Sequence, residues 1–370
     1  MILKRVYDVT ISLLTPVHVG SGAELGRDFD FVTHNGRTWV MNSDAFLEHL
    51  QKPDGSFDER ILGRPASELL EAGDFRPDSP FFRYVLDGQP RSEQYGAVVR
   101  EQYKDAYDRP YLPGSSIKGA LRTVLAWHGF REQGMKLNVN DLRGSRSWAG
   151  QGYEREIFGR DPNHDLLRAL LVADTQPVGQ DRLQLVNAQV VTGGEKLGSP
   201  IELEAVRSDT VFQTTFTIDE FLHSPDAENE LHFGKRWEWL TGLPALARAR
   251  AAQQIEQERD WFRSRKYDNV GRFYHQLLTI LKRNQLPENQ FLVQIGWGGG
   301  WSSKTIGAPL QADGAAWERL LNDKRLSPSR FRRKEGDPFP KSRRAVIVAE
   351  QPVAPLGWCL VEMKERIHAS

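Results

Sequence analysis

The sequence predicts an α+β protein built from two domains, each with a small sheet. A chain of 370 residues is too long for one small domain. Its composition, 39% hydrophobic and 26% charged, is that of an ordinary soluble globular protein. Candidate strands and helices mix in both halves without the regular βαβ rhythm of a doubly wound fold. We expect one domain at residues 1–190 and the other at 191–370.

The first elements are predicted to be strands. Residues 5–14 alternate well enough for a strand, and TPVHVGSG follows as a glycine-rich loop. FDFVTHNGRTWVM predicts a hairpin about an Asn35–Gly36 turn. Ser43 or Asp44 then caps a short helix, DAFLEHL, and a second short helical piece is expected near 66–72.

The stretch YLPGSSIKGALRTVLAWHG predicts a helix over 115–128. Ser115 or Ser116 is a suitable N-cap, and Gly129 is expected to end the helix. The first backbone N–H groups, with Lys118 and Arg122 projecting from one side, indicate a candidate phosphate site. An ordinary capped helix with two solvated cations explains the same local features.

The remaining elements alternate between strands and helices. Polar, glycine-rich residues 130–165 predict a mobile connection, and LLRALLVADT and LQLVNAQVV predict strands. IELEAVRSDTVFQTTFTI predicts a hairpin with its turn at Arg207–Thr210, and a mainly helical stretch follows at about 229–284. FLVQIGWGGGW predicts a strand running into glycines, AAWERLLND a helix, and RAVIVAE and GWCLVEM two closing strands.

The cluster GWGGGWSSKTIG nearly matches a phosphate-binding P-loop. Ser303 stands where the second glycine of that motif is required, and Pro309 forbids the long helix that a P-loop feeds. We therefore reject nucleotide hydrolysis here. Trp297 and Trp301 either stack on bases or pack in the core, which is the more usual fate of a tryptophan.

Residues 324–344, KRLSPSRFRRKEGDPFPKSRR, carry nine Lys and Arg against two Asp and Glu, a local charge of +7. The whole chain has a formal net charge of zero, so this asymmetry is strong. Such a loop often contacts nucleic acid or an acidic partner. A merely solvated loop is the alternative.

Candidate catalytic groups are few. His18, beside a Gly-Ser-Gly run, is a candidate general acid/base, although a lone histidine after a strand is more often structural. Asp28 and Asp30 have no clear metal-ligand partners in the sequence, and the usual hydrolase, dinucleotide and calcium motifs are absent. The single cysteine, Cys359, excludes a disulfide framework and a cysteine-based zinc site. We expect no metal, no cofactor and no enzymatic activity.

No apolar run of 18 residues occurs, and MILKRVYDVTISLL reads as a strand rather than a signal peptide. We therefore expect a cytoplasmic protein without membrane contact.

LTPVHVGSG together with YLPGSSIKGALRT resembles the paired signature of RAMP proteins (repeat-associated mysterious proteins) of type III CRISPR–Cas effectors. IGWGGGWSSKTIG, FPKSRRAVIV and PLGWCLVEM, in that order, resemble the Csm-complex subunit at the crRNA 3′ end of type III-A systems. The resemblance implies two ferredoxin-like (RRM-like) domains, with the helical stretch at 229–284 inserted in the second.

The resemblance also implies a function. It implies a non-catalytic subunit that caps the backbone filament at the crRNA 3′ end, takes part in 3′-end maturation and serves antiviral and anti-plasmid defence. The implied partners are crRNA, the backbone RAMP subunits and other Csm subunits, with host nucleases as candidates for 3′ trimming. The RNA-contact roles that it implies fall on glycines, serines and cations of the quoted motifs: Gly20, Ser21, Gly22, Gly114, Ser115, Ser116, Lys118, Arg122, Gly298, Gly299, Gly300, Lys304, Arg343 and Arg344.

Three alternatives stay open. One is a metal-independent crRNA-processing endoribonuclease that uses His18. Another is target-RNA cleavage through Asp28, because related backbone subunits cut with an aspartate shortly after the HxGSG-like motif. LGRDFDF does not match that pattern well. The third is a pure protein–protein scaffold, which predicts no RNA affinity.

Overall fold

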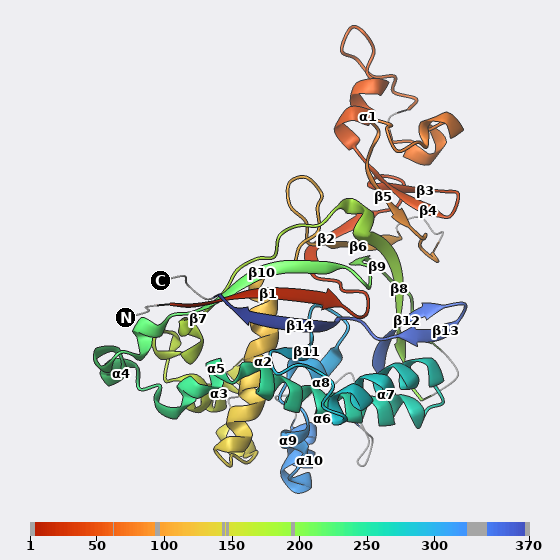
Figure 1. Cartoon of the computed structure of the whole chain (residues 1–370). Coiled ribbons are helices and arrows are strands. Elements are labelled where there is room, and N and C mark those ends of the chain that lie inside the picture. The colour runs from red at the N-terminus through yellow and green to blue at the C-terminus, as the bar shows by residue number, and fades with distance from the viewer. Residues whose placement is uncertain are drawn as a thin grey trace.

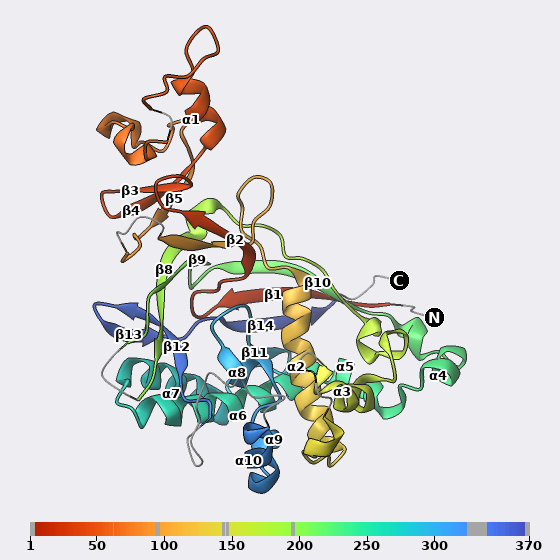
Figure 2. The same ribbon diagram turned by 180° about the vertical axis from the view of Figure 1, so that it is seen from behind.

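The computed structural model describes residues 4–61, 63–92, 97–142, 145, 148–193, 197–323 and 339–366. The α+β class is confirmed, with two curled sheets and helices packed against them (Figure 1). In Figures 1 and 2 a helical layer lies below the five-stranded sheet, and the nine-stranded sheet lies above it and curves down one side of it.

The five-stranded sheet is antiparallel throughout and has the order β11-β14-β1-β10-β7. β1 lies at its centre, where Ile11 pairs with Phe212 on one side and Val361 on the other. The alternation predicted for this strand places Val9 and Ile11 in the core. The strands are β1 (Arg5–Leu13), β7 (Leu170–Val172), β10 (Val211–Ile218), β11 (Gln290–Gln294) and β14 (Trp358–Glu365).

Long helices carry the apolar faces that cover this sheet. α2 buries a stripe that includes Ile117, Leu121 and Leu125, at the helical spacing seen in the sequence. α6 packs on β11, an edge strand of this sheet, and on α2 and α7 (Figure 2). These helices are α2 (Gly114–Glu132), α6 (Leu243–Arg263) and α7 (Asp268–Lys282), the last two within the predicted helical stretch.

The second sheet contains nine strands among the described residues, in the order β2-β6-β9-β8-β5-β4-β3, with β12 and β13 attached to β8 through β12. Its β6–β9 and β5–β8 pairs are parallel, and the remaining pairs are antiparallel. The strands are β2 (Gly20–Gly26), β3 (Phe31–His34), β4 (Arg37–Met41), β5 (Phe82–Asp87), β6 (Val98–Gln102), β8 (Leu183–Val191), β9 (Ile201–Val206), β12 (Arg343–Val348) and β13 (Gln351–Ala354). Part of the predicted glycine-rich loop is therefore strand β2.

The predicted hairpin at 201–218 is wrong in its pairing. Both strands form, but β9 pairs with β8 and β6, whereas β10 pairs with β1 and β7 in the other sheet. The turn before β10 is held by the first strand, because the Asp209 N–H donates to the Leu13 carbonyl at 2.8 Å. The bend at Arg207–Thr210 thus carries the chain from one sheet to the other.

The predicted mobile connection at 130–165 is also wrong in the part described. It contains α3 (Gln151–Phe158), whose Ile157 and Phe158 are buried against the main core. α2 runs on to Glu132, and Gly129 lies buried inside it rather than ending it. The side chain of Ile157 approaches Gly129 so closely that a Cβ there would lie 2.7 Å from it.

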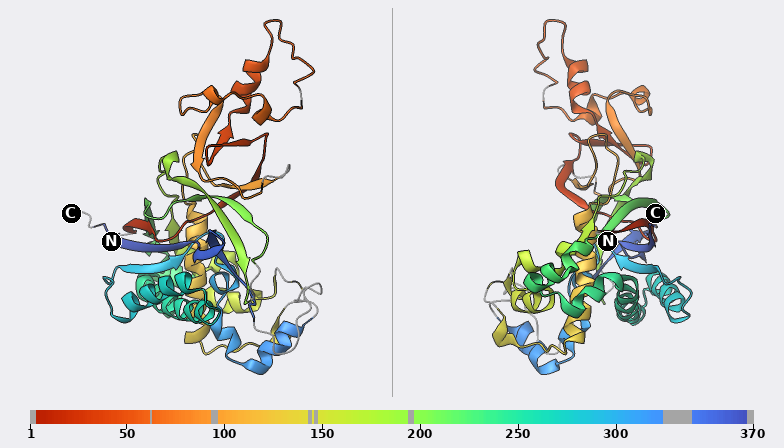
Figure 3. Two further views of the ribbon diagram at one scale, coloured as in Figure 1. Left: turned by 90° about the vertical axis from the view of Figure 1, so that its right-hand side faces the viewer. Right: turned by 60° about the vertical axis from the view of Figure 1, so that its left-hand side comes forward.

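Residues from β3 to β5 form an arm that projects from the body of the molecule (Figure 3). The arm has its own core, which includes Trp39, Phe46 and Phe81. Its hairpin turns at Asn35 and Gly36 as predicted, both with positive φ. Asn42, rather than Ser43 or Asp44, caps its helix α1 (Ser43–Leu50).

The other helices are short. They are α4 (Pro225–Leu231), α5 (Glu238–Thr241), α8 (Gly300–Lys304), α9 (Ala308–Gln311) and α10 (Gly314–Asn322). The 3₁₀ turns are η1 (Ala66–Glu68), η2 (Ala72–Asp74), η3 (Val139–Asp141), η5 (Pro162–His164), η6 (Leu166–Ala169), η7 (Gln180–Arg182), η8 (Glu220–His223) and η9 (Gly234–Trp237).

Both sheets combine strands from before and after residue 190. The division into domains 1–190 and 191–370 stays a prediction. Most of the predicted basic loop, residues 324–338, lies outside the described residues. In the described part of the chain, every helix is too short or too polar to cross a membrane.

Candidate nucleic-acid interface

Three segments that are far apart in the sequence meet at the backbone of His18. The Trp297 N–H donates to the His18 carbonyl at 2.7 Å, and the Tyr103 N–H donates to the Val19 carbonyl at 2.7 Å. Gly296 adopts a φ of 78°, and a Cβ at that position would lie 2.3 Å from the His18 carbonyl. The VHVGSG segment is therefore joined to the GWGGG segment and to the loop that leads into α2.

Two arginines lie over the ring of Trp297. The guanidinium carbon of Arg344, on β12, is 4.8 Å from the ring centroid, and that of Arg100, on β6, is 5.6 Å away. Arg344 has no carboxylate within 4.0 Å among the described residues, and its buried Nε has no hydrogen-bond partner there. Within the described part of the chain, the one carboxylate near Arg100 is that of Glu24, whose Oε1 is 3.8 Å from the Arg100 Nε. We call these three side chains, Trp297, Arg100 and Arg344, the Trp297 cluster.

The electrostatics of the Trp297 cluster favour an anion. Burial lowers the pKa of the Arg344 guanidinium, and the nearby positive charge of Arg100 lowers this pKa further. Two like charges that share one ring repel each other, and one carboxylate at 3.8 Å compensates them only partly. A phosphate placed between the guanidinium groups would relieve this repulsion and accept charge-assisted hydrogen bonds.

His18 lies beneath this surface and is only 2% exposed. Its Nδ1–H donates to the Glu204 carbonyl at 2.6 Å, which fixes the tautomer because a carbonyl only accepts. Burial lowers the pKa of His18 to about 4, and the charges of Arg100 and Lys104 contribute to the lowering. His18 is therefore neutral near pH 7, and its geometry is that of a structural histidine.

A buried polar network centred on Glu204 supports the same surface from below. Its carboxylate accepts from the Tyr84 hydroxyl at 2.7 Å, the Gln102 N–H at 2.9 Å and the Lys104 ammonium at 2.5 Å. Burial and the adjacent carboxylate raise the pKa of Tyr84 well above its ordinary value. These bonds tie β5, β6 and β9 together directly under His18.

The buried neutral state of His18 predicts a specific pH dependence of stability. Its folded pKa of about 4 lies below the unfolded value of about 6.5, so its contribution is complete above pH 6.5 and is lost as the pH falls toward 4. We expect the free energy of unfolding to fall by about 3 kcal/mol more in wild type than in His18→Gln across this range. Urea unfolding at pH 7.5 and pH 4.5 measures the difference, and an equal fall in both proteins would contradict the burial of a neutral imidazole.

The N-terminus of α2 is occupied by the protein's own carboxylate. The Gly114 N–H donates to Asp174 Oδ1 at 2.7 Å, and neither Ser115 nor Ser116 caps the helix, so the predicted cap is wrong. Ser115 is exposed and Ser116 is partly exposed. The carboxylate of Asp174 therefore occupies the position at which an RNA phosphate was expected to accept the Gly114 N–H.

Gly114 and Gly119 offer a matched pair for a stability test. A Cβ at Gly114 would lie 2.2 Å from the Val172 carbonyl oxygen, whereas a Cβ at Gly119 would meet nothing within 4 Å. We expect Gly114→Ala to lower the melting temperature by several degrees, because backbone cannot easily move away. Gly119→Ala is expected to stabilise by roughly 0.5–1 kcal/mol, since alanine favours the helix over glycine. Thermal unfolding followed by circular dichroism measures both, and a neutral Gly114→Ala would contradict the close approach.

The two cations predicted on α2 differ in how far they are compensated. Arg122 donates to Asp165 at 2.7 Å and to Glu154 at 3.0 Å, and it lies 4.0 Å over the ring of Phe158. Lys118 is half-buried, and desolvation lowers its pKa against the opposing influence of Asp165. Arg122 therefore serves first to hold α3 and η6 on α2.

The glycines of the GWGGG segment are partly explained by internal packing. A Cβ at Gly298 would lie 2.9 Å from Leu356, and one at Gly299 would lie 2.5 Å from Ser303. Gly300, with a φ of 66°, faces open space. Lys304 has no ionic partner among the described residues, and desolvation lowers its pKa. Lys304 lines a groove of about 550 Å³ between α2, α3 and α8–α10. Arg122 lines the same groove.

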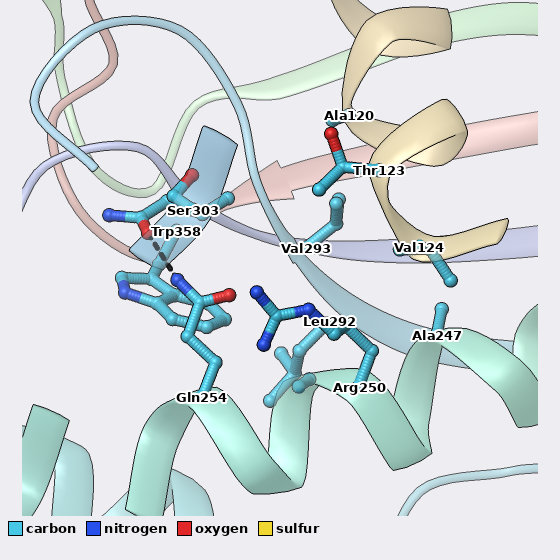
Figure 4. A pocket seen from close by; sticks show the side chains of 12 residues that line it. Ala120, Thr123, Val124, Ala247, Arg250, Gln254, Leu292, Val293, Ser303 and Trp358 are labelled. Carbon is cyan, nitrogen blue, oxygen red and sulfur yellow. Dashed lines mark hydrogen bonds between the residues drawn. The ribbon is translucent and has the colours of Figure 1, made fainter. Parts of the chain in front are cut away.

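A small cavity lies between α2, α6 and β11, next to Ser303 of α8 (Figure 4). Its volume, about 20 Å³, has room for roughly one water molecule and none for a nucleotide. Arg250 is buried beside it and donates through Nη2 to the carbonyls of Ser302, at 2.5 Å, and Thr305, at 3.2 Å. Burial lowers the pKa of Arg250 to about 10. Arg250 therefore anchors α8 to α6.

Adjacent arginines on β12 face opposite sides, as strand alternation requires. Arg344 belongs to the Trp297 cluster. Arg343 instead donates to the buried Glu258 at 2.6 Å, keeps only 10% of its own side chain exposed, and lies 4.7 Å over the ring of Trp261. The charge of Arg343 is therefore compensated inside the protein.

The remaining predicted positions lie at the surface. Gly20, Ser21 and Gly22 are exposed at the start of β2, where the Ser21 hydroxyl donates to Glu101 at 2.7 Å. Asp28 lies at the base of the arm and accepts from the Ser67 hydroxyl at 2.9 Å. In the part of the chain that the structure describes, no group of three or more His, Cys, Asp and Glu could hold a metal ion.

Comparison with protein families adds an independent observation. The model of the RAMP superfamily matches residues 10–303, which is most of the chain. The chain belongs to the RAMP superfamily.

Individual relatives of this RAMP protein point to one kind of subunit. It is 20% identical to a "CRISPR system Cms protein Csm5" from Methanocaldococcus jannaschii over 387 residues, covering 97% of this chain and 89% of the relative. A protein of the same name from Streptococcus thermophilus is 24% identical over 251 residues, covering 58% of this chain and 65% of the relative. The resemblance to a RAMP subunit of a type III-A Csm complex is thereby confirmed.

Solved structures share the fold of this RAMP protein. A chain in the cryo-EM structure of a Csm–crRNA–target RNA ternary complex from a type III-A system superimposes with a TM-score of 0.73 at 23% identity, covering 97% of this chain and 100% of that chain. The crystal structure of T. onnurineus Csm5 gives a TM-score of 0.63 at 21% identity, covering 95% of this chain and 99% of that chain.

Only some residues of the Trp297 cluster could be predicted from the sequence. Arg344 was a predicted RNA-contact residue, whereas Arg100 was not, because the segment VVREQ has the pattern of any half-exposed strand. Trp297 was expected to stack on bases or to pack in the core, but the two arginines over its ring were not predicted. The structure brings Gly20, Ser21, Gly22 and Arg344 toward one region, and it places Arg122 and Lys304 along a separate groove. RNA contact by these residues stays a prediction.

Proposed function

We propose that this RAMP protein is the non-catalytic crRNA-binding subunit that caps the backbone filament of a type III-A Csm complex at the crRNA 3′ end. Its partners are crRNA, the backbone RAMP subunits and the other subunits of that complex, in the cytoplasm. It takes part in 3′-end maturation by holding the RNA, while another nuclease, for which a host enzyme is the candidate, removes the protruding end.

The Trp297 cluster carries this proposal. It presents two incompletely compensated guanidinium groups where the RAMP signature segments converge. Guanidinium groups bind phosphate irrespective of base sequence, which suits a subunit that serves every spacer. Because Arg100 and Arg344 both lie over the indole of Trp297, phosphate contact is favoured here over base stacking.

The absence of catalysis is proposed from the state of the two candidate groups. His18 is buried, neutral and bonded to a backbone carbonyl, so it is poorly placed to protonate a leaving group. Asp28 is bonded to Ser67 and has Arg27 at 3.9 Å, an arrangement that already uses its carboxylate. Neither geometry favours the two nuclease alternatives.

The test is binding of two unrelated fluorescent single-stranded RNAs across a salt series. We expect sequence-tolerant binding that weakens as salt increases. Arg100→Ala and Arg344→Ala should each make the dependence of log affinity on log salt shallower by about 0.7, the value for one lost contact to a single strand. Lys235→Ala, which removes an exposed lysine of η9 in the helical region, is the control and should bind as wild type.

Three outcomes would overturn parts of the proposal. No binding at any salt would favour the pure scaffold. RNA cleavage without metal that His18→Ala abolishes would establish the endoribonuclease alternative. RNA cleavage that Asp28→Ala abolishes would establish target cleavage. A denaturing gel of the bound RNA distinguishes these results from binding of intact RNA.

A further inference from the structure

The loop between β6 and α2 displays an aromatic ring to solvent. Tyr107 is 72% exposed, the largest value among the exposed large apolar and aromatic side chains of the described residues. Single exposed apolar side chains are common at protein surfaces and need no explanation alone. The way in which this loop is built is what sets Tyr107 apart.

The backbone of this loop is fixed on both sides of Tyr107. Asp105 Oδ1 accepts from the N–H groups of Tyr107 and Arg109, both at 2.9 Å. The Tyr107 carbonyl accepts from the Gln180 side chain at 2.9 Å. Asp108 adopts a φ of 60° and is ion-paired to Arg83 of β5. The ring is therefore carried by a braced loop, so little backbone entropy is lost when it binds a ligand.

The guanidinium of Arg109 completes the feature. It lies 5.3 Å from the centroid of the Tyr107 ring and is itself held by Asp105 Oδ2, at 2.8 Å from its Nε. Asp105 compensates its charge, so Arg109 offers a planar surface rather than a free cation for phosphate. The guanidinium lies over the ring of Tyr107, so the opposite face of the ring is the one on which an unpaired base would stack.

The loop also lies next to the proposed RNA surface. Tyr103, at its start, donates its N–H to Val19, and Gly20 pairs with Gln102 in the adjoining strands. Tyr103 packs edge-on against Tyr111, at 5.3 Å between ring centroids. Tyr111 precedes the first residue of α2 by three positions. RNA bound along the exposed Gly20–Gly22 segment would therefore lie close to Tyr103, where this loop begins.

We propose that Tyr107 is a stacking platform for one unpaired nucleobase of the bound RNA. This inference rests on the proposed RNA-binding function and adds a base contact to the phosphate contacts of the Trp297 cluster. Stacking on a ring is tolerant of sequence, because every base has a flat face. It is therefore compatible with a subunit that binds any guide.

The experiment compares full-length wild type, Tyr107→Ala and Tyr107→Phe on a single-stranded RNA and on an abasic oligonucleotide of equal length. Tyr107→Ala should bind the RNA roughly 5- to 100-fold more weakly, with an unchanged salt slope. Tyr107→Phe should bind within about twofold of wild type, because the ring is kept. On the abasic oligonucleotide all three should bind alike. Phe221→Ala, which removes a 54%-exposed ring elsewhere, is the matched control and should have no effect.

Other results overturn the inference in recognisable ways. If Tyr107→Ala binds RNA as wild type while Arg344→Ala binds it more weakly, the proposed function stands and the stacking role fails. If Tyr107→Ala binds RNA normally but assembles poorly with the other Csm subunits, the ring is a protein contact instead. If wild type itself binds neither oligonucleotide, the proposed function fails along with the inference.

Discussion

Replacing Glu204 by alanine is expected to lower the free energy of unfolding by about 3–5 kcal/mol. The carboxylate of Glu204 is fully buried and accepts three hydrogen bonds, from Tyr84, Gln102 and Lys104. Its loss would leave the buried Lys104 ammonium with Glu101 alone, at 3.3 Å. It would also leave the Tyr84 hydroxyl and the Gln102 N–H without their acceptor, and each buried unpaired group adds a cost. Urea unfolding at pH 7.5 measures the change.

Glu24→Ala is the control for Glu204→Ala. Glu24 is a glutamate of the same sheet, but it is exposed on β2 and lies 3.8 Å from Arg100. An exposed ion pair of this kind contributes little to stability, so we expect Glu24→Ala to change the free energy of unfolding by no more than about 0.5 kcal/mol. Similar small effects for both substitutions would show that the network under His18 is solvated rather than buried.

The elements that the sequence predicted well are those that local chemistry specifies. Asn35 and Gly36 both adopt positive φ, which a two-residue hairpin turn requires, and the flanking strands pair as expected. The strand at 183–191 and the closing strand at 358–365 were found from their own residues. The helix of α2 followed from apolar residues at 3.6-residue spacing.

Pairing between distant strands could not be predicted in the same way. β9 begins with alternating apolar and charged residues, Ile201 to Glu204, yet it is buried almost throughout, including Glu202 and Glu204, so the alternation marks no solvent-facing side and does not identify its neighbours. A strand followed by a four-residue turn and another strand indicates a hairpin from local pattern alone. The two strands separate because β10 finds its partner in β1, about 200 residues earlier in the chain, a contact that no local window contains.

The candidate site shows the same limit. A serine ahead of an apolar helix is a normal cap signal, but the actual partner of the α2 N-terminus, Asp174, lies 60 residues away. Likewise, Arg343 and Arg344 look equivalent in the sequence. Only their partners, Glu258 for one and the Trp297 ring for the other, distinguish an internal ion pair from a group available to a ligand.

That difference predicts opposite phenotypes for two neighbouring substitutions. Arg343→Ala removes one partner of a buried ion pair and leaves the Glu258 carboxylate buried without its cation. We expect the free energy of unfolding to fall by about 3–5 kcal/mol. Arg344→Ala removes a charge that has no carboxylate within 4.0 Å among the described residues and that Arg100 repels. We expect its stability to change by less than about 1 kcal/mol.

RNA binding should respond in the reverse order. Arg344→Ala should weaken binding and make its salt dependence shallower, because a phosphate contact is lost. Arg343→Ala, measured at a temperature where the variant is folded, should keep the salt slope of wild type, because its charge was already compensated by Glu258. Urea unfolding and the RNA salt series on both variants decide the matter. Equal losses of stability would contradict the placement of these side chains on opposite faces of β12, and a shallower slope for Arg343→Ala would mean that RNA competes with Glu258 for this arginine.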